Sequence, residues 1–167
     1  MSKITYHTLD ISTKVLPYLP PYIHRMIDHI YVGDHRAQID YDTFDLVVNL
    51  NYPENGVKKG DYVDTQYSPK TRLIKVGIED SDTANLSPFV NELTDTMRDY
   101  VNHNKRILLY SKEGTGRSAA ILSSYLIKRY KFNTSDLMNM YRSSNYHPTL
   151  NMGFVRQLAS LSEQSRR

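Results

Sequence analysis

The segment Ile107–Ala120 constrains the fold of this chain more than any other part of the sequence. It opens on Ile107-Leu-Leu-Tyr110, a run apolar enough for a strand that is buried on both faces. A short loop with two glycines follows, and from Arg117 to about Tyr130 apolar residues recur at helical spacing. A buried strand that turns through a short loop into a helix is typical of α/β domains.

The rest of the chain alternates in the same way. Three further strands are expected at Ile30–Gly33, Phe44–Leu50 and Leu73–Ile78. Further helices are expected where a capping residue precedes a periodic run, with the caps at Ser87 (followed by Pro88), Thr134 or Ser135, and Asn151. The sequence therefore predicts an α/β domain with a central, mostly parallel sheet of about five strands flanked by helices.

The length of 167 residues is that of one domain. Residues 1–23 contain three prolines and little periodicity, so we expect an N-terminal arm with a short helix near Leu9–Val15. This arm is a candidate for packing on the body of the protein or for self-association into a homo-oligomer. Residues 24–167 are expected to form the domain itself.

Composition excludes several classes of function. The 21 basic and 18 acidic residues give a net charge of only +3, and the densest basic run, Lys128–Lys131, is typical of a solvated helix end, so nucleic acid is not an expected partner. No apolar stretch approaches the length of a membrane span, and the N-terminus lacks a secretory signal, so we expect a cytoplasmic or nuclear protein. Cysteine is absent and the six histidines show no paired ligand spacing, so neither a metal site nor a cofactor is expected.

The loop after Tyr110 has the chemistry of an anion site. Successive backbone amides in such a loop form a concave nest, and the following helix adds unpaired amides and the positive end of its dipole. Gly114 and Gly116 allow close backbone approach, and Arg117 offers a bidentate fork to two phosphate oxygens. A tetrahedral dianion is the expected ligand.

Two other loop types do not fit this segment. A Walker A loop would need Gly-Lys-Ser/Thr, and a nucleophile elbow would need Gly-x-Ser-x-Gly around Ser111. From the loop alone, an ordinary glycine-rich turn stays an alternative.

Residues 110–118 resemble the His-Cys-x-x-Gly-x-x-Arg-Ser signature of protein tyrosine phosphatases, in particular the small atypical dual-specificity phosphatases. The matching residues are Gly114, Arg117 and Ser118. The resemblance extends over about residues 24–161. It includes Ile30–Gly33, Val47–Leu50, Glu79–Ser87, Pro148–Phe154 and Gln157-Leu158.

The resemblance implies a reaction and the residues that perform it. In the family a cysteine thiolate attacks phosphorus and an aspartic acid protonates the leaving group. The resemblance assigns the general-acid position to Asp80, with Asp82 as the local competitor, and adds Ser118 to the catalytic residues. It implies phosphate binding by the loop residues Ser111, Lys112, Glu113, Gly114, Thr115, Gly116 and Arg117. Asn151 either caps the last helix or, by resemblance, braces this loop.

Two central positions depart from the signature. Tyr110 stands where the family has histidine, and Ser111 stands where it has the nucleophilic cysteine. A serine hydroxyl ionises far less readily than a thiol, and Glu113, the one nearby carboxylate, is a weak candidate for a base. This pair of changes resembles the STYX-type pseudophosphatases, which keep the phosphate site without catalysis.

Two functions therefore remain open. One is a catalytically inactive phosphatase-fold protein that binds phosphorylated tyrosine, and by resemblance serine or threonine, in a partner protein. The alternative is an active dual-specificity phosphatase, with Asp80 as general acid, in which Ser111 replaces an original cysteine as in a substrate-trapping variant. Two lesser alternatives are a structural protein whose loop binds nothing and a serine-based hydrolase. Lys112 faintly suggests a phosphoinositide, but Glu113 beside it argues against a polyanionic headgroup.

Overall fold

The computed structural model describes residue 16 and residues 18–167. Most of the expected N-terminal arm, including the helix expected near Leu9–Val15, lies outside the described residues. The described chain joins the fold at β1 (Ile23–Arg25), and the division of the chain at residue 23 stays a prediction. In the part that the structure describes, no helix has the length and apolar character needed to cross a bilayer.

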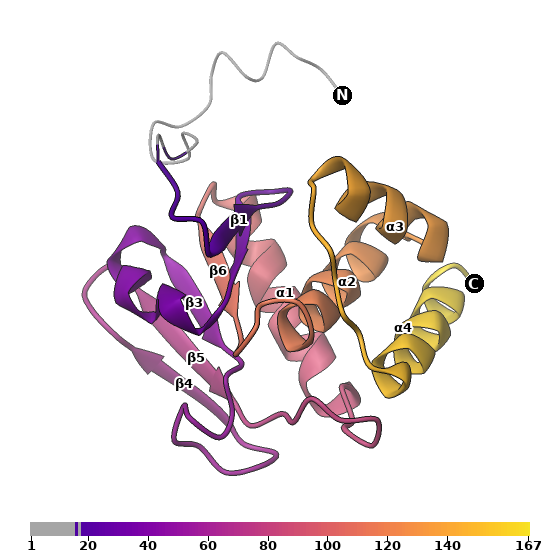
Figure 1. The fold of residues 1–167 in the computed structure, drawn as a ribbon, viewed down its shortest axis with the longest axis horizontal. Coiled ribbons are helices and arrows are strands. Elements are labelled where there is room, and N and C mark those ends of the chain that lie inside the picture. Colours follow the sequence, from indigo (N-terminus) through magenta and orange to yellow (C-terminus); the bar gives the residue numbers. More distant parts are fainter. Residues whose placement is uncertain (1–15, 17) are drawn as a thin grey trace.

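A six-stranded sheet forms the centre of the fold, in the order β1-β2-β6-β3-β5-β4 (Figure 1). The four inner strands are parallel to one another, whereas β1 and β4 pair antiparallel at the two edges. This arrangement confirms the predicted α/β fold with a mostly parallel sheet. The strands are β1 (Ile23–Arg25), β2 (Ile30–Gly33), β3 (Leu46–Asn49), β4 (Tyr62–Gln66), β5 (Arg72–Val76) and β6 (Ile107–Tyr110).

The edge strands β1 and β4 bring the sheet to six strands, where about five were expected. Four of the five residues of β4 are exposed, so this strand lacks the apolar run that marks a buried strand. β1 is only three residues long and follows two prolines. Short, exposed edges of this kind carry little sequence signal.

The register of the inner strands brings three strand ends together. Tyr110, the last residue of β6, is paired with Gly33 at the end of β2 and with Asn49 at the end of β3. Because parallel strands end at the same edge, the segments that follow them meet there. Open α/β sheets bind their ligands outside this carboxyl edge.

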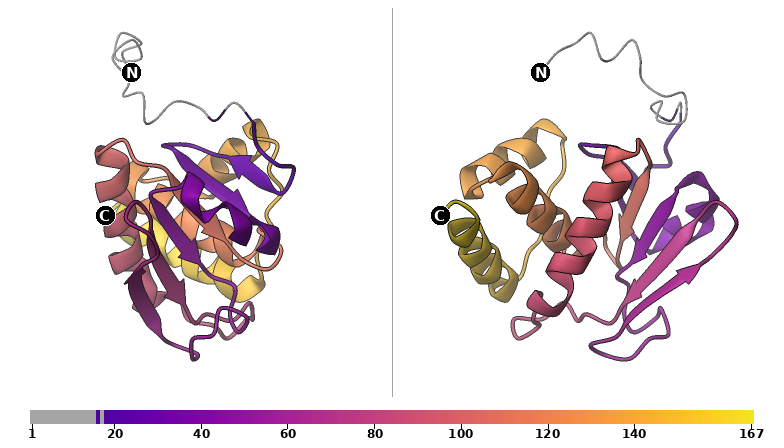
Figure 2. Two further views of the ribbon diagram at one scale, coloured as in Figure 1. Left: turned by 90° about the vertical axis from the view of Figure 1, so that its left-hand side faces the viewer. Right: turned by 180° about the vertical axis from the view of Figure 1, so that it is seen from behind.

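Two layers cover the sheet (Figures 1 and 2). The larger core lies on the face of the sheet that α1 (Ser87–Asn102) and α2 (Arg117–Tyr130) cover, and it continues between α2 and the outer helices α3 (Thr134–Ser143) and α4 (Met152–Ser165). A smaller core on the other face is covered by the 3₁₀ segment η3 (His35–Thr43) and by half-buried residues of the chain before β1. The strands β2, β3 and β6 are buried along their whole length because both faces are covered.

The helix starts differ from expectation at two places. α1 begins at Ser87 itself, with Leu86 in the cap position and no side-chain cap, so the expected Ser87 cap is wrong. α3 is capped by Asn133, whose side chain accepts from the backbone of Asp136 while the Asp136 carboxylate accepts in return, so neither Thr134 nor Ser135 is the cap. Amide and hydroxyl caps are interchangeable by type, so the sequence alone does not fix the helix start to one residue.

Candidate active site

The Ser111–Arg117 loop connects the end of β6 to the first turn of α2. Ser111 is 2% exposed, and its backbone amide donates to the Gly33 carbonyl at 3.3 Å. Arg117 is 6% exposed and lies at the helix start, where Gly116 in the cap position provides no side-chain cap. The positive end of α2 therefore points at the loop without a competing internal acceptor.

Gly114 is required by the backbone of the loop. Its φ of +77° lies in the left-handed region. A Cβ at Gly114 would lie 2.8 Å from the carbonyl carbon and oxygen of Gly33. The loop therefore packs directly on the end of β2, and only glycine allows this approach.

The backbone amides and the backbone carbonyls of the loop differ in their hydrogen bonding. Within residues 18–167, the amides of residues 112–117 donate no hydrogen bond. Three loop carbonyls, by contrast, accept hydrogen bonds from neighbouring segments. Lys112 accepts from His35, Gly114 from the Tyr146 hydroxyl at 2.6 Å, and Thr115 from the Thr149 amide at 2.8 Å. The loop thus has three carbonyls bound from outside and the amides of residues 112–117 available, which is the condition for an anion site.

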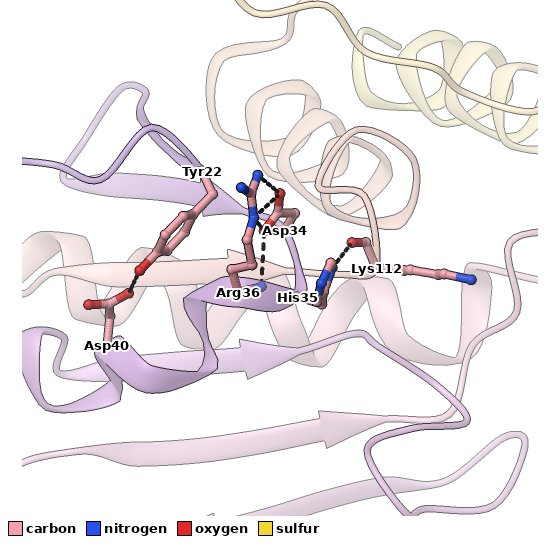
Figure 3. Close-up of polar contacts among 6 residues, drawn as sticks. All are labelled: Tyr22, Asp34, His35, Arg36, Asp40 and Lys112. Carbon is pink, nitrogen blue, oxygen red and sulfur yellow. Dashed lines mark hydrogen bonds and ion pairs between the residues drawn. The ribbon is translucent and has the colours of Figure 1, made fainter.

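The β2–η3 turn forms one wall beside the loop (Figure 3). The His35 amide and ring Nδ1 both reach the Lys112 carbonyl, at 3.2 and 3.0 Å, while the Lys112 side chain extends away from His35. Arg36 is held by Asp34 and lies over the Tyr22 ring at 5.0 Å. Burial alone would raise the pKa of Asp34, but hydrogen bonds from Arg36 lower it below its usual value, so this carboxylate is ionised and paired.

Arg117 is a buried cation with free donors. Its Nη1 donates to the carbonyls of Tyr52 at 2.7 Å and Ile78 at 3.0 Å. Burial lowers the pKa of Arg117, while the carboxylates of Asp80, Glu54 and Glu113 act in the opposite direction; an arginine remains charged under these conditions. Nε and Nη2 have no partner among residues 18–167, so the guanidinium is fixed by one nitrogen and can donate with the others. Its expected fork on phosphate stays a prediction.

Asp80 lies against the start of α2. A Cβ at Gly116 would come within 2.3 Å of Asp80 Oδ2, which places this carboxylate directly over the loop. The other oxygen, Oδ1, accepts from Asn151 Nδ2 at 2.8 Å, and Asn151 Oδ1 caps α4 by accepting from the Phe154 amide at 2.8 Å. Asn151 therefore caps the last helix and also touches the Asp80 carboxylate. The competitor Asp82 lies against Gly153 with its backbone, and both aspartates are exposed, so contact with Gly116 rather than burial distinguishes Asp80.

Comparison with known proteins identifies the family. Residues 30–164 match the family described as "Dual specificity phosphatase, catalytic domain". The chain belongs to this family.

Individual relatives are distant. "Putative tyrosine phosphatase 123R" of Invertebrate iridescent virus 6 is 23% identical over 137 residues, which cover 81% of this chain and 88% of that protein. The solved structure of human DUSP28 is 23% identical with a TM-score of 0.73 and covers 89% of this chain and 98% of that chain. Human tyrosine phosphatase-like serine/threonine/tyrosine-interacting protein is 15% identical with a TM-score of 0.71, covering 87% and 98%. Identities this low show a common fold.

Ser111, which the sequence predicts to occupy the family's nucleophile position, lies at the start of the loop. Its hydroxyl lies 2.9 Å from the Ser118 hydroxyl. Among the described residues no carboxylate or imidazole contacts Ser111, and Glu113 forms no hydrogen bond with it. The expected loop residues from Ser111 to Ser118 are thus brought together, but without a general base at the serine.

Tyr110 points away from the loop, into the smaller core. Its hydroxyl lies 2.5 Å from that of Tyr41, which also accepts from Asn49 Nδ2 at 3.2 Å. Burial, followed by the contact with Tyr41, raises the pKa of Tyr110, so the phenol stays protonated. Tyr110, predicted to stand where the family has histidine, is therefore a structural residue of the smaller core.

Sequence reasoning missed three residues that touch the loop: His35, Tyr146 and Thr149. His35 and Tyr146 lie in segments with no motif, and their contacts depend on long-range packing. Thr149 lies within the segment that resembles the family, yet its contacts with Thr115, through the backbone and at 2.7 Å between the hydroxyls, have no sequence signal.

Proposed function

We propose that this protein binds phosphorylated residues of partner proteins in the Ser111–Arg117 loop and does not hydrolyse them. The ligand class is phosphotyrosine, together with phosphoserine and phosphothreonine because the compact domain has no added segments to deepen the site. The supporting observation is a loop in which the amides of residues 112–117 have no partner among the described residues and three carbonyls accept hydrogen bonds, next to a buried arginine with donors to spare.

Ser111 accounts for the proposed lack of turnover. A cysteine thiol has an ordinary pKa of about 8.5, which a helix N-terminus and an arginine lower further. An alcohol ionises at far higher pH, and each pKa unit costs about 1.36 kcal/mol. Among the described residues, Ser118 is the one hydrogen-bond partner of the Ser111 hydroxyl, and another alcohol does not remove this cost.

A second candidate function is an active phosphatase in which Ser111 replaces cysteine. The observation that favours it is the Asp80 carboxylate, which lies over Gly116 and is oriented by Asn151. A protein that only binds phosphate has no need for a general acid at this place.

Binding is tested by calorimetry with a phosphotyrosine peptide and its unphosphorylated form. We expect binding of the phosphorylated peptide only, and about tenfold or greater weakening in Arg117→Ala, because charged bidentate hydrogen bonds are lost. Arg117→Lys, which keeps the charge, serves as a second variant in case Arg117→Ala does not fold. Arg98→Ala is the matched control, since Arg98 is exposed and pairs with Asp95 far along α1. Equal affinity for both peptides would remove the phosphate site from consideration.

Catalysis is tested with p-nitrophenyl phosphate. We expect no turnover by the chain with Ser111 and measurable turnover by Ser111→Cys, which Asp80→Asn in the same background should lower. Clear turnover by the unaltered chain would overturn the proposal. Ser111→Cys without turnover would argue against the second candidate.

A further inference from the structure

The three occupied carbonyls of the loop have a geometric consequence for its amides. In a trans peptide the C=O of one residue and the N–H of the next lie in one plane and point in opposite directions. His35 holds the Lys112 carbonyl from the β2–η3 side. Tyr146 and Thr149 hold the carbonyls of Gly114 and Thr115 from the segment between α3 and α4.

It follows that the neighbouring amides are turned away from these donors. The N–H of Glu113 points away from His35, the N–H of Thr115 away from Tyr146, and the N–H of Gly116 away from Thr149. The donors lie outside the loop, on two different segments. The three amides therefore face the inside of the loop, where they can act together on one anion.

We propose that His35 and Tyr146 are positioning residues that fix the direction of these amides before a ligand binds. The proposal rests on the proposed function, because it concerns how the same loop binds phosphate. Donors fixed in advance need no reorganisation when the anion arrives, and this lowers the cost of binding. Neither side chain touches the ligand itself.

Tyr146 is suited to this role by its burial. It is 2% exposed, and its ring contacts Tyr141 and His24. Burial raises the pKa of Tyr146, so its hydroxyl stays a donor. Within residues 18–167, this hydroxyl is the only hydrogen-bond donor to the Gly114 carbonyl.

His35 acts on the opposite side with two donors, its amide and its ring nitrogen. Because the Lys112 carbonyl can only accept, Nδ1 carries the proton in this contact. The charged neighbours Asp34 and Arg36 are paired with each other, which leaves the imidazole to Lys112 (Figure 3). Since the His35 amide remains after side-chain removal, a change at His35 should matter less than one at Tyr146.

The test measures phosphotyrosine-peptide affinity in Tyr146→Phe, His35→Ala and His35→Asn. We expect about five- to tenfold weaker binding in Tyr146→Phe, the usual effect of one lost hydrogen bond, and about two- to threefold in His35→Ala. His35→Asn should restore affinity, because the asparagine amide places a donor near the position of Nδ1. Tyr125→Phe is the matched control: Tyr125 is equally buried, and its hydroxyl donates to Asp28 away from the loop at 3.0 Å.

Unchanged affinity in Tyr146→Phe, or failure of His35→Asn to restore it, would refute the positioning role while leaving phosphate binding intact. A second measurement judges the proposal without ligand: NMR order parameters of the backbone amides of residues 112–116. We expect them to fall in Tyr146→Phe and not in Tyr125→Phe. If the unaltered chain binds no phosphopeptide, the proposed function fails, and equal order parameters would then refute the positioning role separately.

Discussion

Tyr110 and Ser111 are neighbours in sequence, yet they belong to two regions that differ in hydrogen bonding. Polar groups around Tyr110 bind one another, whereas the amides beyond Ser111 are left without partners in the described part of the chain. The hydroxyl of Tyr110 lies in a cluster with Tyr41 and Asn49, in which polar groups bind one another inside the smaller core. Beyond Ser111, the loop amides have no partner among the described residues, and the Arg117 guanidinium has only one nitrogen bound. Polar groups paired within the fold stabilise it, whereas those left available are suited to a ligand. Substitutions on the two sides should therefore separate stability from binding.

Gly114→Ala should have the largest effect, because it adds a Cβ where the loop packs directly on the backbone of Gly33. The variant combines a positive φ with a Cβ at 2.8 Å from the Gly33 backbone. We expect a loss of about 3 kcal/mol in the free energy of unfolding together with loss of phosphopeptide binding. Gly56→Ala is the control, since Gly56 also has a positive φ but nothing within 4 Å, and should lose only about 1 kcal/mol. Urea unfolding checks both, and equal losses would show that the contact with Gly33 is unimportant.

Tyr110→Phe should lower the stability of the fold without changing phosphopeptide binding. Removing the hydroxyl takes away the contact with Tyr41 inside the smaller core, so we expect a loss of about 1–2 kcal/mol in the free energy of unfolding. Phosphopeptide affinity should stay the same, because this side chain points away from the loop. Altered affinity without altered stability would contradict the separation of the two regions.

Asn151 has both a structural contact and a contact with the site. Its Oδ1 caps α4 and its Nδ2 donates to Asp80, and different substitutions test the two contacts separately. Asn151→Ala should lower the free energy of unfolding by about 1 kcal/mol through loss of the α4 cap. Asn151→Ser keeps a capping oxygen but has no amide to reach Asp80, so stability should be retained. In a Ser111→Cys background, Asn151→Ser should still lower p-nitrophenyl phosphate turnover. Full turnover in this variant would mean that Asn151 does not orient Asp80.

The smallest expected effect is the part that Tyr110 contributes to the loss of stability at alkaline pH. The pKa of Tyr110 is raised in the folded protein by burial. Above pH 10 the unfolded chain therefore loses a proton that the folded chain keeps, and stability falls as pH rises. By pH 10.5 this one group costs about 0.8 kcal/mol of stability. Chemical unfolding at pH 9 and 10.5 should show a smaller loss for Tyr110→Phe than for the unaltered chain, and parallel losses would place the ionisation elsewhere.

The parts of the fold predicted from sequence are those with strong local patterns. β2, β6 and α2 have the expected bounds, because an apolar run or a helical period marks each of them. The six-residue loop between β6 and α2 follows from its glycines. That Asp80 lies near the loop is predicted from the resemblance to a family, because no local pattern indicates it.

The remainder depends on contacts between distant segments. The exposed edge strand β4 and the capping residues Leu86 and Asn133 have weak or ambiguous local signals. His35 and Tyr146 reach the loop only because β2 ends beside β6 and the α3–α4 segment crosses next to it. Such contacts depend on how the strands pair in the sheet, and the pattern of a single segment does not predict that pairing.

The contact between Gly114 and Gly33 limits how sequences of this type can diverge. With the loop resting on the backbone at the end of β2, an insertion just after Gly33 would displace the anion site along with the turn. In the connection between β3 and β4, by contrast, a Cβ at Gly56 or Gly60 would have no heavy atom within 4 Å. Homologues should therefore keep the β2–η3 turn at constant length and tolerate a side chain more readily at Gly56 or Gly60 than at Gly114.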